Sequence, residues 1–250
     1  MLAGTGPESP LPSVPLAPRL HPRGSMRFAL LLLAALCAAP TAARAQGSWT
    51  IGAGSGAFVF GDFVEIHTTV SNELDRLEIE ETLSAATRAG LHVQIGRWID
   101  ERWSIRADGT FVRAPFTVET ASNDDSGVSL EVGEIDVVTV ALAAALRFNR
   151  GGALRPSVFA GPAWTSYSID RNEQTGAPPV FTGSRSELGG VAGAGLEWWL
   201  SDRFAVQGEI SDTLTPSPFE REDFPAVNEG ELNITDIHHV HTIIGVLYRF

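Results

Sequence analysis

The sequence predicts an all-β fold: an eight-stranded antiparallel up-and-down transmembrane β-barrel with short turns at one end and long loops at the other. Three observations support this class. Apolar and polar residues alternate with period two in eight segments. The connections between these segments are alternately short and long. Aromatic residues gather at the segment ends beside the short connections and the termini.

The eight segments are each about as long as the roughly 9–11 residues of a tilted membrane-spanning strand, or longer. They cover residues 48–61, 87–98, 103–114, 134–148, 154–167, 186–200, 204–214 and 237–250. Three connections are tight and read "IDER", "NRGGA" and "SDR". The other four are polar and span residues 62–86, 115–133, 168–185 and 215–236. Short periplasmic turns and longer outer loops are typical of bacterial membrane barrels.

The facing of the residues favours a membrane barrel over a water-soluble one. If Phe250 points outward, its strand places Tyr248, Val246 and Ile244 on the same face. The opposite faces of the predicted strands carry charged residues and glycines. A soluble barrel keeps its apolar face inside, so the opposite arrangement indicates that hydrocarbon surrounds the barrel.

The aromatic residues are expected to form a girdle at the membrane interface, where Trp and Tyr rings are favoured. The girdle beside the short turns is predicted to contain Trp49, Trp98, Trp103, Trp198 and Phe204, extended by Phe148, Trp199 and the terminal aromatics. A less complete second set near the long loops contains Phe60, Phe116, Trp164 and Tyr167. The alternative, core aromatics of a secreted sandwich, predicts no clustering at one end.

Residues 26–45 are predicted to be a secretory signal peptide. Arg27 precedes an apolar core over residues 28–39, and a small-x-small motif places the cleavage between Ala45 and Gln46. The rival interpretation is a membrane anchor. The apolar stretch is too short for that and is followed by a cleavage site.

Two segments flank the signal. The Pro-rich residues 1–25 are interpreted as an over-extended start or a disordered leader, and residues 46–250 as the barrel domain. The single cysteine, Cys37, lies in the signal, so the exported chain is expected to lack disulfides and thiolate metal ligands. A formal net charge of -12 argues against nucleic-acid binding, which requires a basic surface. All 18 basic residues are arginines.

These features resemble the OmpA/OmpX-type outer-membrane barrels over residues 46–250. The terminal "LYRF", with Tyr248 and Phe250 on one face, resembles the C-terminal assembly signal of that class. The resemblance implies a location in the bacterial outer membrane and recognition by the barrel-assembly machinery. It also implies contact with outer-membrane lipid and lipopolysaccharide, for which divalent cations could serve as bridges. We expect a monomer that needs no cofactor.

The lumen of an eight-stranded barrel is narrow enough to be filled by side chains. The inward set contains both signs of charge, and buried charges persist only when they are paired. We therefore expect an ion-pair network that plugs the lumen, formed by Arg88, Arg106, Asp108, Arg147, Arg155, Glu197 and Glu209. The alternative is that perturbed carboxylates mark an active site.

The sequence "DIHHVH" suggests a metal site. His239 and His241 share the lumen face of a strand at a spacing that suits two ligands of one ion, and His92 or a loop carboxylate could be the third. The alternative is a polar strand end whose histidines are hydrogen-bonded to each other.

Two of the long loops are acidic. Residues 62–84 contain seven acidic residues against Arg76, and residues 215–236 contain six against Arg221. Such oxygen-rich surfaces can hold Ca²⁺ or Mg²⁺. The simpler interpretation is a solvated surface, because neither loop has ordered ligand spacing.

Three functions remain open. The first is a non-enzymatic surface barrel that serves envelope integrity, adhesion or binding through its acidic loops. The second is a lipid A-modifying enzyme, which needs a serine with a positioned histidine and a carboxylate. The third is a small channel for ions or apolar solutes of the OmpW-like type. We expect the first, with no catalytic residues.

Overall fold

The computed structural model describes residues 48–71, 76–122, 125–149, 152–171, 183–224 and 231–250. These residues form β1 (Trp49–Phe60), β2 (Val64–Ser71), β3 (Arg76–Ala85), β4 (Arg88–Trp98), β5 (Trp103–Ser122), β6 (Asp125–Arg147), β7 (Leu154–Arg171), β8 (Gly183–Trp199), β9 (Phe204–Thr215), the short 3₁₀ turn η1 (Arg221–Asp223), β10 (Glu231–Ile234) and β11 (Ile237–Arg249). The predicted leader, signal peptide and Ala45–Gln46 cleavage site lie outside the described residues. No helix in the described part of the chain is long and apolar enough to cross a membrane.

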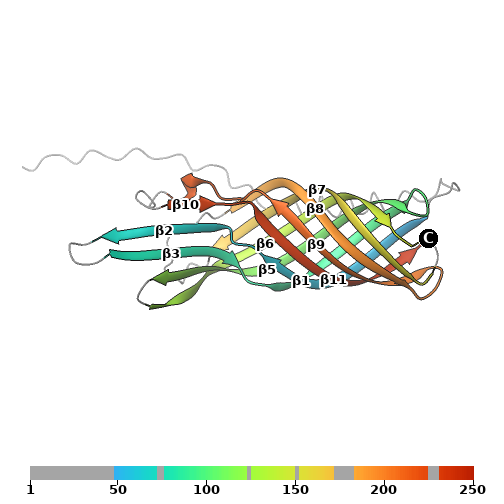
Figure 1. Cartoon of the computed structure of the whole chain (residues 1–250), viewed down its shortest axis with the longest axis horizontal. Helices are drawn as coiled ribbons and strands as arrows, with labels where there is room; N and C mark the ends of the chain where they lie inside the picture. The colour runs from blue at the N-terminus through green and yellow to red at the C-terminus, as the bar shows by residue number, and fades with distance from the viewer. Residues whose placement is uncertain (1–47, 72–75, 123–124, 150–151, 172–182, 225–230) are drawn as a thin grey trace, which may run out of the picture. The chain divides into compact units, whose positions relative to one another are not determined.

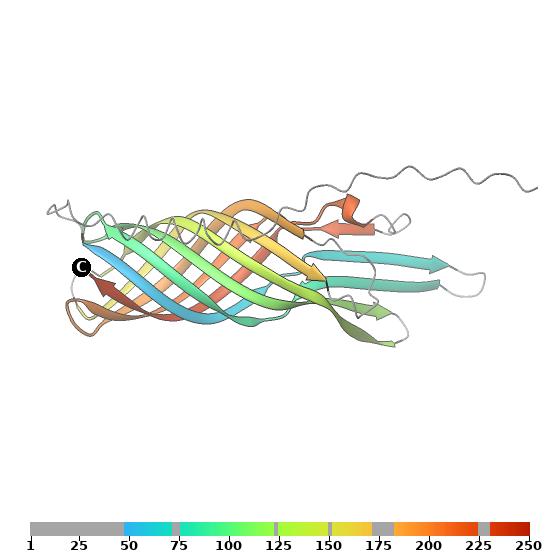
Figure 2. The same cartoon turned by 180° about the vertical axis from the view of Figure 1, so that it is seen from behind.

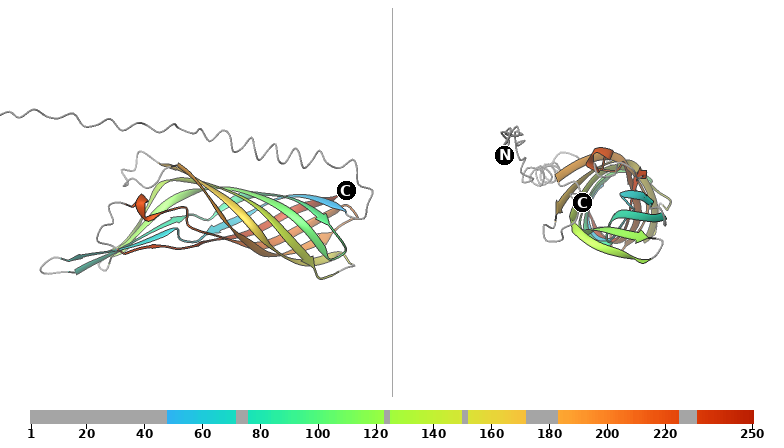
Figure 3. Two further views of the ribbon diagram at one scale, coloured as in Figure 1. Left: turned by 90° about the horizontal axis from the view of Figure 1, so that it is seen from above. Right: turned by 90° about the vertical axis from the view of Figure 1, so that its left-hand side faces the viewer.

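Eight strands close into an antiparallel barrel (Figures 1 and 3). Their order around the barrel is β1-β4-β5-β6-β7-β8-β9-β11, and β11 pairs back with β1. The right-hand view of Figure 3 shows the strands as a ring around the lumen. The predicted fold class is confirmed. At the short-turn end, each strand begins or ends within one residue of the sequence-based boundary.

The long connections are largely β-structure rather than irregular loops. β2 and β3 form a hairpin. Its second strand, β3, pairs with the part of β5 that is farthest from the short turns. β5 and β6 continue past the barrel, and β10 pairs with β2. Figures 1 and 2 show these strands projecting from the end opposite the C-terminus. High charge suggested loops there, but a strand beyond the membrane needs no apolar outer face, so charge and strand pairing are compatible.

Two of the short turns share one hydrogen-bonding scheme, and their sequences also match. In the β4–β5 turn, the Oδ1 atom of Asp100 accepts hydrogen bonds from the backbone N–H groups of Arg102 (2.7 Å) and Trp103 (2.8 Å). In the β8–β9 turn, Ser201 Oγ accepts from the backbone N–H groups of Arg203 and Phe204. Asp and Ser favour tight turns because their side chains bond to nearby backbone in this way. Both turns therefore end their strands at a defined residue.

Small residues let β1 and β11 approach closely where the barrel closes. Gly54 of β1 is paired directly with Gly245 of β11. A Cβ atom added at Gly56 would overlap the carbonyl oxygen of Thr242 on β11. The glycine-rich start of the barrel therefore has a packing function, since a side chain at Gly56 would push the two strands apart.

The burial pattern matches a barrel surrounded by hydrocarbon. Large apolar side chains such as Leu91, Leu142 and Ile244 are exposed on the outer face. Along β9, the alternate residues Gln207 and Glu209 are buried inside. This apolar-out, polar-in alternation is the one expected of a membrane barrel.

Candidate functional site: the barrel lumen

A charged layer fills the lumen toward the short-turn end, around Arg106 of β5. Its Nη2 atom lies 2.6 Å from Asp108 Oδ1 and 2.9 Å from Glu209 Oε2, and its Nε donates to Asp108 Oδ2 at 2.8 Å. Gln94 accepts from the Arg106 guanidinium (3.1 Å), and Gln207 donates to Glu209 (2.5 Å). One arginine therefore joins β4, β5 and β9 across the lumen.

The environment makes these contacts strong. The Arg106 side chain is 8% exposed, and those of Asp108 and Glu209 are 10% and 2% exposed. The guanidinium also lies over the ring of Phe159, 4.1 Å from its centroid. Charge-assisted hydrogen bonds of this kind are about twice as strong as neutral ones. Removing the arginine would leave two buried carboxylates unpaired.

A second charged group lies nearer the short-turn mouth. Arg147 Nη2 is 2.7 Å from Glu197 Oε2, and the indole N–H of Trp199 donates to the same oxygen at 2.7 Å. The Arg147 guanidinium stacks on Trp98, 3.4 Å from the ring centroid. Arg155 stacks on the other indole, Trp199, at 5.0 Å, and its Nε donates to the backbone oxygen of Gly152.

Arg88 departs from the expected network, because its side chain is exposed. It begins β4 at the outer end of the barrel, opposite Phe58 in the register. Phe58 is buried there against the ring of His241, with a centroid separation of 4.4 Å. Since aromatic rings fill the lumen at this level, the Arg88 guanidinium remains in solvent. The alternation along the strand predicted that Arg88 lies on the lumen face of β4. It did not predict that aromatic rings already occupy the lumen at this level.

The charged layer around Arg106 leaves little free volume. Between Arg106, Gln94, Gln207 and Glu197 lies a cavity of about 20 Å³. A space of this size holds about one water molecule. The side chains of this layer therefore leave room for about one water molecule between them.

The outer half of the lumen is an apolar core, which the sequence reading did not anticipate. Phe63, between β1 and β2, is fully buried at its centre. Its ring lies 5.7 Å from Phe116, 6.0 Å from Phe219 and 6.1 Å from Tyr167, measured between centroids, each edge to face. We call this group the outer aromatic cluster; it also contains Phe58, Phe60, Val64, Ile66, Leu83, Ala85, Val112, Ala114, Val132, Ile135, Val137, Ile169 and Ile237.

A folded segment before β10 covers this cluster. Phe219, just ahead of η1, is buried and stacks on Phe116. Arg185 of β8 donates to both carboxylate oxygens of Asp223, at 2.7 and 2.9 Å, and also to the backbone oxygen of Pro218. Ser217 Oγ donates to the backbone oxygen of Phe63. The segment is therefore hydrogen-bonded both to Arg185 of β8 and to Phe63 in the connection between β1 and β2.

The two lumen histidines are held by aromatic and hydroxyl partners. His239 Nε2 is 2.7 Å from the Tyr167 hydroxyl, which is itself 2.5 Å from Thr215 Oγ1. His241 lies against Phe58, and the proposed third ligand, His92, lies 3.3 Å from Asp108. Across the described residues, no group of three or more His, Cys, Asp or Glu side chains could hold a metal ion. His239 and His241 therefore belong to no such group within those residues, and a metal site at these two histidines stays a prediction.

The aromatic girdle agrees only in part with the sequence reading. Trp103, Trp198 and Phe204 are exposed on the outside, and Trp49 is half-buried beside Arg97. Trp98 and Trp199 instead face the lumen and are buried. Both occupy inward positions of their strands, so strand alternation overrides the interface preference of Trp.

The second, outer girdle is mostly absent for the same reason. Phe60, Phe116 and Tyr167 are buried in the outer aromatic cluster, and only Trp164 of that set is exposed.

The terminal aromatics lie together on the outside. The rings of Tyr248 and Phe250 stack with centroids 6.2 Å apart, and Tyr248 lies 5.0 Å from Phe204. They therefore share one outward face at the end of β11, as the alternation along that strand requires.

The acidic surface is concentrated on the projecting strands. Glu65, Glu78, Glu80 and Glu81 are at least partly exposed on β2 and β3. Burial, together with the nearby carboxylates of Glu65 and Glu119, raises the pKa of Asp62, which precedes β2. Within the described residues, these acidic side chains belong to no group that could hold a metal ion.

Comparisons with known proteins agree with this architecture. A family model described as the outer membrane protein beta-barrel domain matches residues 28–250. The chain belongs to this family. Its structure is similar to OprG from Pseudomonas aeruginosa, with a TM-score of 0.52 and 13% identity, covering 82% of this chain and 96% of OprG.

Two further solved barrels resemble the chain. One is the N-terminal barrel of Pseudomonas aeruginosa OprF, with a TM-score of 0.42, 15% identity and coverage of 82% of this chain and all of that one. The other is Ail of Yersinia pestis, with a TM-score of 0.41, 12% identity and the same coverage. No curated protein matches the sequence. The family places the protein in the bacterial outer membrane, with the short turns on the periplasmic side.

Several residues that build the lumen were missed by the sequence reading. Phe58 alternates with small residues in "SGAFVF", so strand parity could have placed it inside. Gln94 also lines the lumen and could have been found in the same way. Phe63 and Phe219 lie outside the barrel strands. No periodicity marks such positions, so only the folded chain reveals them.

Proposed function

We propose that the protein is a non-conducting, non-enzymatic surface barrel that acts through its projecting outer strands. One observation supports this proposal: side chains extend into the lumen at two successive levels. The Arg106 layer leaves a cavity of about 20 Å³, and the outer aromatic cluster follows toward the outer mouth. A water-filled path for solutes would have to cross both.

The outer strands supply the interaction surface in this proposal. β2, β3, β10 and the upper parts of β5 and β6 continue the barrel sheet beyond the outer mouth. Glu78 and Glu80 are exposed there. An acidic β-surface suits binding of a basic partner or of divalent cations that bridge to anionic lipopolysaccharide.

An imidazole–carboxylate pair on the outer face does not favour catalysis. His238 Nδ1 lies 2.7 Å from Asp212 Oδ2, and both side chains are solvent-accessible. The residues paired with them across the sheet are Leu214, Val240 and Ala192. None of these carries a hydroxyl or thiol nucleophile, which acyl-transfer chemistry of this kind requires.

Planar-bilayer recording tests the closed lumen. We expect no single-channel steps from the purified wild-type protein. The double variant Phe63→Ala/Phe219→Ala should also remain closed, because the Arg106 layer persists. Adding Arg106→Ala removes both levels and should produce steps. Well-resolved steps from the wild-type protein would refute the proposal.

Lipid assays test the non-enzymatic part. Purified protein incubated with phospholipid and with lipopolysaccharide should release no fatty acid and transfer no acyl chain. Turnover that is lost on His238→Ala, while the folded barrel is retained, would assign an enzyme instead.

A further inference from the structure

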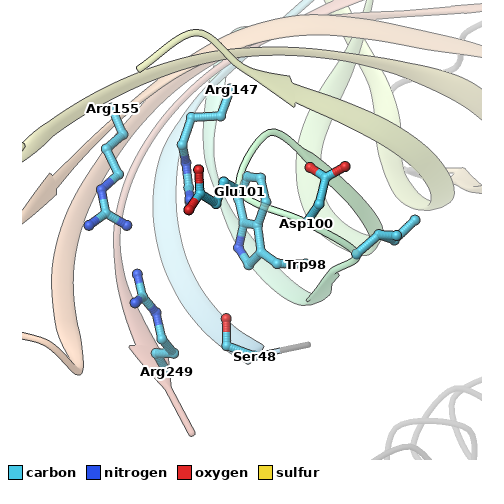
Figure 4. Close-up of a pocket in the computed structure, with 8 residues that line it drawn as sticks. Ser48, Trp98, Asp100, Glu101, Arg147, Arg155 and Arg249 are labelled. Carbon is cyan, nitrogen blue, oxygen red and sulfur yellow. The ribbon is translucent and has the colours of Figure 1, made fainter. Parts of the chain in front are cut away.

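A second cavity opens at the short-turn mouth of the barrel. Its volume is about 470 Å³, within the range of small-molecule sites. It is lined by Ser48, Trp98, Ile99, Asp100, Glu101, Arg147, Arg155 and Arg249 (Figure 4). Three of the eight lining residues are arginines, so cationic groups from β6, β7 and β11 converge here.

Two buried indoles hold the guanidinium groups in place. Arg147 stacks on Trp98 at 3.4 Å, and Arg249 stacks on Trp199 at 3.9 Å, each measured to the ring centroid. Arg155 also lies over Trp199, at 5.0 Å. A stacked guanidinium is fixed through its flat face, while its N–H donors point outward in the plane parallel to the ring. The side chains are therefore preorganised for an acceptor.

Two buried donors lie beside this cavity. The Nε atoms of Arg147 and Arg249 are buried, and neither has a hydrogen-bond partner among the described residues. The Arg147 side chain is only 6% exposed. Three neighbouring cations also repel one another, and an anion in the cavity would relieve that repulsion.

The acidic residues nearby do not fully neutralise the arginines. Glu197 is bonded to Arg147 and to the Trp199 indole. Asp100 accepts two backbone hydrogen bonds from its own turn. Figure 4 shows Glu101 on the Arg147 side, whereas the guanidinium ends of Arg155 and Arg249 point toward each other. The Arg155–Arg249 side of the cavity is thus the part open to an added anion.

We propose that this cavity binds a small oxyanion, a carboxylate or phosphate group, between Arg155 and Arg249. Arginine is suited to both groups because its planar donors match paired oxygens. The cavity opens on the periplasmic side, so the ligand is a periplasmic solute or the end of a larger molecule that carries such a group. A lipid headgroup offers the same phosphate chemistry from the surrounding leaflet.

The test uses the purified protein in zwitterionic detergent. Inorganic phosphate and succinate are titrated separately, with chloride keeping the ionic strength constant, and tryptophan fluorescence reports on Trp98 and Trp199. We expect a saturable change for at least one of the two anions. Arg155→Gln and Arg249→Gln should each weaken binding about tenfold, the loss of one charge-assisted contact.

A matched control separates a site from general electrostatics. Arg203→Gln removes the same charge from an exposed turn at the same end without touching the cavity. It should bind like the wild type. Equal weakening in Arg203→Gln would overturn the proposal. So would the lack of a saturable response to phosphate, to succinate and to the anionic lipid.

A lipid arm identifies the source of the anion. Nanodiscs containing phosphatidylglycerol are compared with purely zwitterionic ones. A response to the anionic lipid alone, lost in Arg155→Gln, would assign the headgroup, and a response to free anions would assign a solute. Heat-modifiable gel mobility confirms that each variant is folded.

Discussion

The two halves of the lumen are lined by opposite kinds of side chain. Toward the periplasm, Arg106 binds Asp108 and Glu209, so the interior is charged and its contacts are directional hydrogen bonds. Toward the outside, Phe63, Phe116 and Phe219 pack edge to face or stacked, so the interior is apolar. Both halves lie within one continuous barrel sheet.

The difference shows what each half can tolerate. Charged groups in a narrow lumen need every partner in place, because each lost contact leaves a buried charge. Aromatic packing is less directional and depends on volume. The outer half can therefore take its residues from segments between strands, such as Phe63 and Phe219, whereas the charged half draws its residues from the strands themselves.

The largest effect is expected from Arg106→Leu, which attacks the charged half. Asp108 and Glu209 would stay buried without their cation. Breaking a buried pair in this way costs about 3–5 kcal/mol. Urea unfolding in detergent, followed by tryptophan fluorescence, measures the loss.

Arg113→Leu is the matched control on the same strand. Arg113 also forms two hydrogen bonds with an aspartate, Asp136, both at 2.6 Å, but its side chain is 57% exposed. Exposed pairs contribute less than about 1 kcal/mol. Similar losses in the two variants would show that burial does not distinguish these pairs, and the contrast between the halves would fail.

Phe63→Ala tests the apolar half and should have the next largest effect. The side chain is fully buried, and its ring contacts those of Phe116, Tyr167 and Phe219. Truncating a buried phenylalanine costs about 3 kcal/mol or more. The same unfolding assay measures it. The control, Phe148→Ala, removes an outward-facing ring and should cost clearly less. Equal costs would mean that the cluster is not a packed core.

Gly56→Ala tests the contact between β1 and β11, where the barrel closes. The added methyl would overlap the Thr242 carbonyl oxygen and force β1 from β11. Overpacking of this kind costs about 1–3 kcal/mol. Gly208→Ala is the control, since nothing lies within 4 Å of a Cβ added there. We expect the folded gel band of Gly56→Ala, and not that of Gly208→Ala, to be lost at a lower temperature than the wild-type band. An unchanged temperature would show that β1 and β11 can shift to accept the methyl group.

Strand alternation explains how much of this could be predicted. The strand parity that placed Arg106, Asp108 and Glu209 inside also applies to Trp98 and Trp199, yet these two were assigned to the membrane interface from residue type. Parity is a geometric constraint, whereas the interface preference of Trp is statistical, so parity prevails.

The outer aromatic cluster and the projecting strands could not be predicted from the sequence, for a different reason. Phe63 and Phe219 are separated by more than half of the barrel domain and meet through ring contacts that no local pattern encodes. The acidic β2–β3 hairpin was read as a loop because its charge masked the alternation. Long-range packing and strand extension beyond the membrane depend on neighbours in space, which composition does not specify.

The smallest effect is expected at the rim of the apolar half, from Asp62→Asn. Burial first, and then repulsion by Glu65 and Glu119, raises the pKa of Asp62, so its ionised form is disfavoured in the folded protein. A neutral asparagine removes that cost. The variant should therefore be slightly more stable than the wild type at neutral pH, with most of the effect screened because Asp62 is largely exposed.

The pH dependence gives the sign of this last prediction. A raised folded-state pKa means that the wild type gains stability as the pH falls through that pKa and Asp62 becomes neutral. The advantage of Asp62→Asn should be full above the folded-state pKa and vanish below the unfolded-state one. Unfolding midpoints across this range measure it, with Asp202→Asn in the opposite, exposed turn as the control. An advantage that persists in acid would trace to the amide itself, and the charged rim would then have no part in limiting the stability of the apolar half.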